Sequence, residues 1–289
     1  AHLGDIDVCY VVDGDEGPPI VLIHGLGFQL IDWEPAFVHG LIAAGYRVIR
    51  LDNRDAGLST HLEGKVALGE LRRGVDQGAT VSVPYLLGDM AADVAGLFDH
   101  LEIDAAHVIG VSMGGYIAQE LAVRHPSRVL SLTTMMSSTG DRRVGQPTAQ
   151  GNRALFRAPS ADLDAAVEDM VEARRILATS GAFDEDAERD RARRAVARSF
   201  DPAGTGRQLA AIWASGDRTE ALRRLEVSAL VIHGADDHLV GVSGGLATAE
   251  AIPNCRLLVI EEMGHDLPRI HLEEILGAIV AFLDSVPLQ

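Results

Sequence analysis

The sequence contains little cysteine and few aromatic residues, and it has no excess of positive charge. The two cysteines of the 289 residues, Cys9 and Cys255, lie far apart without CxxC spacing, so neither a disulfide framework nor a zinc site is indicated. Aromatic residues make up 4% of the chain, which leaves few rings on which single-stranded nucleic acid could stack. The net charge of −17 excludes nucleic acid and an anionic membrane as expected partners, because both require local positive potential.

Long apolar runs are also missing. No run approaches the roughly 18 residues of a membrane span, and residues 1–4 do not begin a basic segment followed by an apolar one, so we expect no signal peptide. We therefore expect a cytoplasmic protein whose cysteines are reduced, small, buried strand residues. The chain is 47% hydrophobic and 23% charged, which is typical of globular proteins.

Short apolar runs alternate with longer helical segments. Six runs of strand length are apolar on both faces: 19–24, 46–52, 107–111, 129–134, 229–233 and 256–260. Such runs are typical of a parallel sheet that helices cover on both sides. Residues 85–101, 115–124 and 272–283 show helical spacing of apolar side chains. The alternation predicts an α/β fold with a mostly parallel central sheet, and residues 6–12 predict an antiparallel edge strand.

One long segment breaks this alternation. Residues 137–222 contain no apolar strand run, and residues 162–200 combine alanine with mixed charge at helical spacing. We predict a helical cap at 137–222, inserted into a core of residues 1–136 and 223–289. This segment carries a group of arginines next to acidic residues: Arg189, Arg191, Arg193, Arg194 and Arg198. We interpret the group as a helix surface that pairs with itself rather than as an anion site.

Ser112 lies in the stretch Gly-Val-Ser-Met-Gly-Gly at 110–115, directly after a predicted strand and before a predicted helix. A turn this tight strains its central residue, and the flanking glycines relieve the crowding. It holds the hydroxyl at the carboxyl end of the sheet, next to a helix N-terminus that stabilises negative charge. We predict that Ser112 is a nucleophile; the alternative, a serine that only caps the helix, would not require three glycines.

A serine nucleophile needs a base, and neutral imidazole is the usual one near pH 7. Of the eleven histidines, His265 follows the last predicted strand and precedes the last predicted helix. It therefore lies in a loop at the carboxyl edge of the sheet, and we predict it as the base. His24 and His233 each end a strand before a glycine, and we expect them to support their loops.

The acid that orients the base is expected after a strand between the serine and the histidine. Asp236 and Asp237 both follow the strand at 229–233. We choose Asp237, which lies further into the loop, and expect Asp236 to shape the turn. The order Ser112, Asp237, His265 along the chain is that of α/β-hydrolases.

Flexible backbone amides follow the first central strand in the stretch His-Gly-Leu-Gly at 24–27. In this arrangement the amides of Leu26 and Met113 would form the oxyanion hole, although a plain turn would also account for the glycines. No phosphate loop, dinucleotide fingerprint, HExxH motif or cysteine–histidine cluster is present, so we expect neither a metal nor an organic cofactor.

Four stretches together resemble the α/β-hydrolase fold superfamily: 24–27, 52–60, 110–115 and 264–268. More narrowly, they resemble small serine esterases that include aclacinomycin methylesterases and cofactor-free haloperoxidase-like enzymes. The resemblance implies the same nucleophile, base, acid and oxyanion hole, and it implies that the cap is the variable region. Serine at position 112 disfavours epoxide hydrolases and haloalkane dehalogenases, which use aspartate there. Residues 61–83 correspond to a loop of this family but are glycine-rich and long for it, and we expect this loop to lie over the entrance of the site.

These features predict a serine esterase that cleaves a small-molecule carboxylic ester through an acyl-enzyme. The same triad would also serve a lactonase, a C–C bond hydrolase or a perhydrolase, and a ligand-binding relative without turnover is the alternative from another class. The sequence leaves the oligomeric state open, a homo-oligomer included. Six apolar residues of the cap favour an apolar substrate: Leu155, Phe156, Ile176, Leu177, Phe183 and Trp213.

Overall fold

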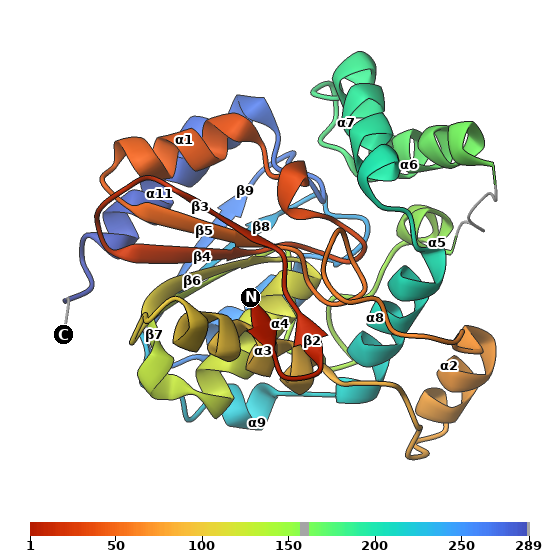
Figure 1. The fold of residues 1–289 in the computed structure, drawn as a ribbon, viewed down its shortest axis with the longest axis horizontal. Helices are drawn as coiled ribbons and strands as arrows, with labels where there is room; N and C mark the ends of the chain where they lie inside the picture. Colours follow the sequence, from red (N-terminus) through yellow and green to blue (C-terminus); the bar gives the residue numbers. More distant parts are fainter. Residues whose placement is uncertain (157–161, 288–289) are drawn as a thin grey trace.

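The structure, a computed structural model, describes residues 1–156 and 162–287; residues 157–161, inside the predicted cap, and 288–289 lie outside this description. Within the described ranges a seven-stranded sheet has the order β3-β5-β4-β6-β7-β8-β9 (Figure 1). Its strands are β3 (Tyr10–Asp13), β4 (Pro19–Ile23), β5 (Arg47–Leu51), β6 (Ala106–Val111), β7 (Val129–Met135), β8 (Ala229–Gly234) and β9 (Cys255–Ile260). Only β3 runs antiparallel to its neighbour, which is β5.

The register of the central strands determines where the loops after them meet. β4 pairs with β6 from Ile20 opposite His107 to Ile23 opposite Gly110, and both strands end within one residue of the last pair. The carboxyl ends of β4, β6, β7 and β8 therefore lie at one edge of the sheet. The residues that follow these strands are brought close together although they are far apart in the chain.

Helices cover both faces of the sheet (Figure 1). One face carries α1 (Pro35–Ala43) and α11 (Leu272–Leu283), and Ile20 and Leu22 of β4 pack toward it. The next residues of β4, Val21 and Ile23, pack toward the opposite face. That face carries α3 (Leu87–His100), α4 (Met113–Arg124), α9 (Thr219–Leu222) and α10 (Ser243–Ala251). Burial on both sides explains why these strands read as continuous apolar runs.

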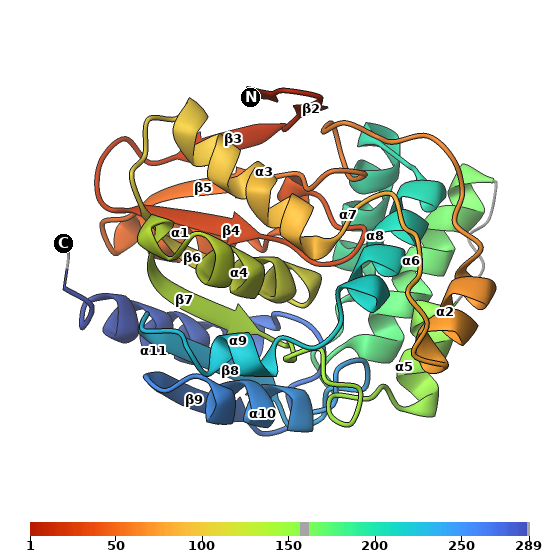
Figure 2. The ribbon, with the colours of Figure 1, turned by 90° about the horizontal axis from the view of Figure 1, so that it is seen from below.

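Between β7 and β8 the described residues form helices and loops without a strand. The helices are α5 (Ala149–Leu155), α6 (Leu163–Leu177), α7 (Glu185–Arg198), α8 (Pro202–Ser215) and the short α9. In Figure 2 the arrowheads of β4 and β7 point toward α5 to α8, which stand beyond the carboxyl ends of the strands. We call α5 to α8 the cap; the division of the chain into a core and a cap at 137–222 stays a prediction.

Aspartate side chains that bond to free backbone amides determine where two of these helices, α6 and α7, start. Asp162 accepts a hydrogen bond from the amide of Ala165 at 2.9 Å, three residues into α6. Asp184 does the same for the amide of Ala187 at the start of α7, at 3.1 Å. Aspartate at these positions satisfies an amide that would otherwise lack a partner. An apolar cluster between α6 and α7 then joins the pair: Val167, Val171, Ala192 and Val196.

Two N-terminal expectations need correction. Residues 61–83 are not only a loop, because they contain the helix α2 (Leu68–Asp76). Residues 6–12 do not form one strand, because β2 (Ile6–Asp7) pairs with β1 (His2–Leu3) before β3 joins the main sheet. Three short 3-10 helices complete the described elements: Leu30–Asp32, Pro126–Arg128 and Arg269–His271.

The cysteines are half-buried rather than fully buried, which corrects a further expectation. Cys9 lies between β2 and β3, and Cys255 begins β9 at the edge of the sheet. Burial raises the pKa of the Cys255 thiol to about 11. Among the helices of the described ranges, none combines the length and apolarity needed to cross a bilayer.

The arginines of α7 contact the core as well as their own helix. Arg189 pairs with glutamates of α6 and α7, as expected. Arg191, however, contacts Glu34 at 2.9 Å, and Arg198 contacts Asp52 at 2.7 Å. The prediction of a self-paired surface is therefore wrong for Arg198 and incomplete for Arg191, which also contacts Glu188 of its own helix at 3.6 Å. Their core partners lie more than a hundred residues away in the chain, where charge spacing on a single helix carries no information.

Candidate active site

Ser112 occupies the tight turn between β6 and α4. Its backbone angles, φ 55° and ψ −120°, lie in a region that residues other than glycine rarely adopt. A side chain at Gly110 would collide with the backbone of Gly114, and one at Gly114 would collide with the carbonyl of Ile23. The glycines are thus required by close backbone approach. This turn presents the hydroxyl of Ser112 at the carboxyl edge of the sheet.

The hydroxyl of Ser112 is the first member of a chain of hydrogen bonds. His265 Nε2 lies 2.9 Å from Ser112 Oγ, and His265 Nδ1 lies 2.6 Å from Asp237 Oδ2. The amides of Leu239 and Val240 donate to Asp237 Oδ1, both at 2.8 Å. A carboxylate at Nδ1 favours the tautomer protonated there, which leaves Nε2 as the acceptor facing the serine.

The two candidate acids differ sharply in environment. The side chain of Asp237 is fully buried. Burial by itself would raise the pKa of Asp237, but His265 and hydrogen bonds from His233 and His265 outweigh it and hold that pKa well below its usual range. Asp236 is exposed, and its amide donates to the carbonyl of Met263. The structure therefore places Asp237, and not Asp236, against His265.

His24 and His233 hold loops beside the site. His24 Nδ1 accepts from the following amide at 2.8 Å, and its ring stacks on Phe28 with centroids 4.6 Å apart. Burial lowers the pKa of His24 to about 4, which keeps the ring neutral. His24 also lines the cavity. His233 Nε2 lies 2.7 Å from the carbonyl of Val240 and 3.4 Å from Asp237 Oδ2, beneath the acid.

The loop after β4 lies close to the serine. A side chain at Gly25 would reach within 3.2 Å of Ser112 Cβ. Among the described residues, none accepts a hydrogen bond from the amides of Leu26 or Met113. The amide that follows Leu26 donates to Gln208 Oε1 of α8 at 2.8 Å. The cap thus holds this loop in place and leaves the two amides beside the serine free for a ligand.

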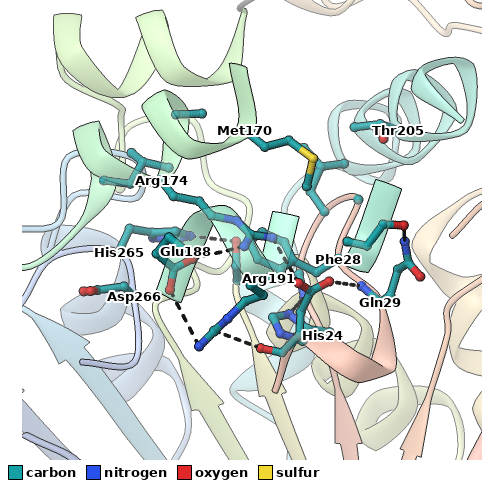
Figure 3. Close-up of a pocket in the computed structure, with 18 of the residues that line it drawn as sticks. His24, Phe28, Gln29, Met170, Arg174, Glu188, Arg191, Thr205, His265 and Asp266 are labelled. Atoms are coloured by element: carbon teal, nitrogen blue, oxygen red, sulfur yellow. Dashed lines mark hydrogen bonds and ion pairs between the residues drawn. The ribbon is translucent and has the colours of Figure 1, made fainter. Parts of the chain in front are cut away.

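A cavity of about 500 Å³ opens above Ser112, between the sheet edge and the cap. Met170 and Arg174 reach into it from α6, opposite His24 and Phe28 (Figure 3). Its apolar lining includes Leu26, Phe28, Met136, Leu155, Met170, Leu177, Phe183, Phe200, Leu209 and Leu239. Three of the six apolar cap residues that we expected at the substrate are in this lining. Ile176, Phe156 and Trp213 are not, and the rings of Phe156 and Trp213 pack on each other with centroids 5.9 Å apart.

Charged side chains also line the cavity. In the part of the lining that the structure describes, all three arginines are ion-paired: Arg174 with Asp32 at 3.0 Å, Arg191 with Glu34 at 2.9 Å, and Arg269 with Glu34 at 3.2 Å. These contacts join α6 and α7 of the cap to the segment after β4. The arginines are therefore already neutralised by protein carboxylates.

One group of side chains in the described chain has the composition of a metal site. Atoms of Asp55, His61 and Asp201 lie within 4.8 Å of one another. Arg207 Nη2 contacts Asp55 at 2.8 Å and Asp201 at 2.9 Å. The guanidinium supplies the positive charge that both carboxylates require, so the group fits an ion-pair network better than a metal centre.

Two buried cap residues that contact the site loops were missed at the level of sequence. Gln208 contacts the loop after β4, and Thr179 contacts the loop that carries His265. The partner of Gln208 lies 181 residues away in the chain, and the partner of Thr179 lies 85 residues away. Neither residue belongs to a motif, so only the tertiary contact reveals them.

The chain matches known proteins over most of its length. A model of the alpha/beta hydrolase fold matches residues 18–268. A rhodomycin D methylesterase of Streptomyces peucetius is 30% identical over 285 residues, which cover 91% of this chain and 90% of that protein. A 2-hydroxy-6-oxononadienedioate/2-hydroxy-6-oxononatrienedioate hydrolase of Paraburkholderia xenovorans is 28% identical over 97% of this chain and 91% of its own. A thermophilic esterase of Thermogutta terrifontis superposes with a TM-score of 0.73 at 24% identity, over 99% of this chain and 96% of that one.

Proposed function

Because the chain belongs to the alpha/beta hydrolase fold family, we propose that it hydrolyses a carboxylic ester with Ser112 as nucleophile, His265 as base and Asp237 as orienting acid. The fold class expected from the sequence is confirmed, and the relatives named above are hydrolases. The observation that carries the proposal is the unbroken chain of hydrogen bonds from Ser112 Oγ to Asp237 at the floor of the cavity.

The first half of the proposed reaction acylates Ser112. Ser112 Oγ attacks the carbonyl carbon of the ester while its proton moves to His265 Nε2. The bond from that carbon to the alcohol oxygen then breaks, and His265 Nε2–H gives its proton to the leaving alcohol. The ionised Asp237 stabilises the positive charge that His265 carries between these two steps.

The second half returns the enzyme to its starting state. Water gives a proton to His265 Nε2 and attacks the acyl carbon. The bond from that carbon to Ser112 Oγ breaks, the acid leaves, and Ser112 Oγ recovers its proton from His265. Protons are balanced over the cycle, and no step requires a metal or an organic cofactor.

The negative oxygen of each tetrahedral intermediate needs donors that are already in place. The amides of Leu26 and Met113 are suited to this role because no other described group uses them and Met113 begins α4. A donor of this kind contributes about 2.7–4 kcal/mol to lowering the barrier.

The cavity favours an ester with a bulky apolar part. Its volume of about 500 Å³ and its leucine, methionine and phenylalanine lining suit such a molecule. The methylesterase relative, whose name gives rhodomycin D as its substrate, is consistent with this choice. We therefore place the substrate among apolar carboxylic esters.

A dioate hydrolase is the second candidate, because the name of the Paraburkholderia relative gives a dioate as its substrate. A dioate carries two carboxylates. Each arginine in the described cavity lining already faces a protein carboxylate, so none of the three offers a dioate a positive charge without a counter-charge. This observation favours the ester.

Ester turnover by Ser112→Ala tests the proposal. We expect the variant to lose roughly 10⁴-fold or more of its kcat on p-nitrophenyl esters, because the nucleophile is gone. Ser285→Ala, at the end of the chain beyond α11, serves as the matched control and should stay within threefold of the wild type. An unchanged rate in Ser112→Ala would refute the assignment.

A substrate panel separates the chemistries that share this machinery. We expect the wild type to prefer an apolar ester over a lactone, a dioate C–C substrate and peracid formation at matched concentrations. If a lactone, a dioate C–C substrate or peracid formation gives a higher kcat/KM than the ester, that class replaces the ester as the proposed substrate class.

A further inference from the structure

The loop that carries His265 is bonded to the cap at three consecutive residues. The amide of Gly264 donates to Thr179 Oγ1 at 2.9 Å, and the amide of His265 donates to the carbonyl of Leu177 at 2.7 Å. Thr179 in turn donates to Asp266 Oδ1, from its hydroxyl at 2.6 Å and from its amide at 3.1 Å. We call these four hydrogen bonds the base clamp. All of its cap atoms come from residues 177–179, at the end of α6.

The contact with residues 177–179 explains why residue 264, directly before His265, is a glycine. A Cβ at Gly264 would lie 2.5 Å from the carbonyl oxygen of Leu177, 2.8 Å from the carbonyl carbon of Ala178 and 2.9 Å from the amide of Thr179. All three are backbone atoms, which cannot turn away as a flexible side chain can. Glycine at 264 therefore fits the close approach of the cap to the base loop.

The hydroxyl of Thr179 acts as donor and acceptor at once, and the residue is only 1% exposed. Valine has nearly the same shape but cannot make either bond, whereas serine can make both. The carboxylate of Asp266 is also held away from water; burial raises its pKa, while the two donors of Thr179 act in the opposite direction. Loss of the hydroxyl would leave the buried amide of Gly264 without its acceptor, and Asp266 Oδ1 would keep only the amide of residue 179 as a donor from the cap.

We propose that Thr179 is a positioning residue, through which the cap holds His265 in line with Ser112. This inference rests on the proposed function, in which His265 is the base. His265 must reach Ser112 Oγ and Asp237 at the same time, and a misplacement of about 1 Å at a reacting group can cost about 100-fold in rate. The cap thereby contributes to catalysis through its contact with the base loop as well as by lining the cavity.

Three variants test the role of Thr179: Thr179→Val, Thr179→Ser and the control Thr248→Val. Thr248 is fully buried in α10 and donates to the carbonyl of Gly244 at 2.8 Å, outside the cavity, so its loss also removes a buried hydroxyl. The readouts are kcat and KM on a p-nitrophenyl ester, the rate of fluorophosphonate labelling of Ser112, and the melting temperature.

We expect Thr179→Val to lower kcat by about 10- to 100-fold with KM within twofold, and to slow labelling in parallel. Thr179→Ser should restore kcat to within threefold. Thr248→Val should lower the melting temperature about as much as Thr179→Val does, while its kcat stays within threefold of the wild type. A Thr179→Val enzyme that keeps its kcat, or a loss of kcat that serine does not restore, would overturn the inference.

A second pair of variants applies if Thr179→Val does not fold. Asp266→Ala removes the acceptor of the clamp and should show the same loss of kcat, whereas Asp266→Asn keeps an acceptor oxygen and should recover most of it. Equal activity of the alanine variant and the wild type would again overturn the inference. Failure of the proposed function looks different, because the wild type itself would then neither turn over the ester nor take up the label.

Discussion

At the scale of single residues, Ser112 combines strained backbone with very little space around it. A residue other than glycine at positive φ of this kind costs on the order of 1–3 kcal/mol, which the surrounding structure must offset. Hydrogen bonds hold the turn, since the Ser112 amide donates to the carbonyl of Met135 at 2.8 Å and Ser137 Oγ donates to the carbonyl of Ser112 at 2.7 Å. The strain thus coincides with a rigid placement of the hydroxyl.

Alanine at position 114 should disrupt this placement. Its Cβ would meet the backbone carbonyls of Ile23 and His24, so we expect a loss of about 1–3 kcal/mol in the free energy of unfolding together with most of the ester turnover. Urea unfolding and turnover measure the two effects. Gly277→Ala is the control, since no atom lies near the new Cβ in α11 and the change should stabilise the helix by up to about 1 kcal/mol. A Gly114→Ala variant with the stability and ester turnover of the wild type would show that close backbone approach at position 114 does not hold Ser112 in place.

The two neighbouring aspartates provide a test of the acid. We expect Asp237→Asn to lower kcat by roughly 10⁴-fold, because an amide favours the wrong tautomer of His265. Asp236→Asn, at the exposed neighbour, should stay within threefold. Steady-state kinetics on the same ester compares the two variants, and similar losses in both would mean that the acid is wrongly assigned.

At the scale of elements, buried ion pairs join the cap to the core. Arg207 of α8 is 2% exposed and contacts Asp55, whose side chain is fully buried in the loop after β5. The hydroxyl of Tyr85 also donates to Asp55, at 2.6 Å. Because a buried charge depends on its partner, each such pair makes the docking of a cap helix a condition for a stable core.

Replacing Arg207 with methionine should expose this dependence. We expect a decrease of about 3–5 kcal/mol in the free energy of unfolding, because Asp55 would remain buried without its cation. Arg193→Met on α7 is the control: its side chain is 63% exposed, and the change should stay within about 0.5 kcal/mol. Chemical denaturation measures both, and a small effect at Arg207 would show that this pair does not hold the cap.

The sequence revealed those elements whose burial leaves a pattern in the chain. Strands β4 to β9 begin and end within two residues of the expected runs, because both faces of each are covered except at the β9 edge. The helix α2 was missed because, of its nine residues, Leu71 alone is buried and two are glycines. An element that touches the rest of the molecule so little has no stripe to read.

The same limit applies at the site. Ser112, Asp237 and His265 each follow a recognisable strand, so their meeting at one sheet edge could be predicted from chain order and strand position. Thr179 follows the cap helix α6, and Gln208 belongs to the cap helix α8. Polar residues are common in and after such helices and carry no positional signal. Only the docking of the cap gives them neighbours.

At the scale of the whole molecule, two buried histidines make stability depend on pH. Burial lowers the pKa of both His24 and His107 to about 4, below the value of about 6.5 for an unfolded chain. Between these values the unfolded chain binds protons that the folded protein does not. The free energy of unfolding should therefore fall as the pH decreases from about 6.5 toward 4.

The slope of that decrease is measurable. Each histidine should contribute up to about 1.4 kcal/mol per pH unit within this window. Replacing His107 with asparagine, which can still bond Ser131, should remove one share of the slope in urea unfolding between pH 7 and pH 4.5. His39→Asn, at an exposed position, controls for the loss of a histidine. An unchanged slope in His107→Asn would contradict the assigned cause.

The proposed hydrolysis depends on an activated hydroxyl of Ser112 at the floor of the cavity. Labelling with a fluorophosphonate, followed by mass spectrometry of the peptides, tests this most directly, because an ordinary serine does not react. We expect one equivalent of label on Ser112, with a much slower reaction in His265→Asn. Label on another residue, or an intact and folded wild type that takes up none, would contradict the account.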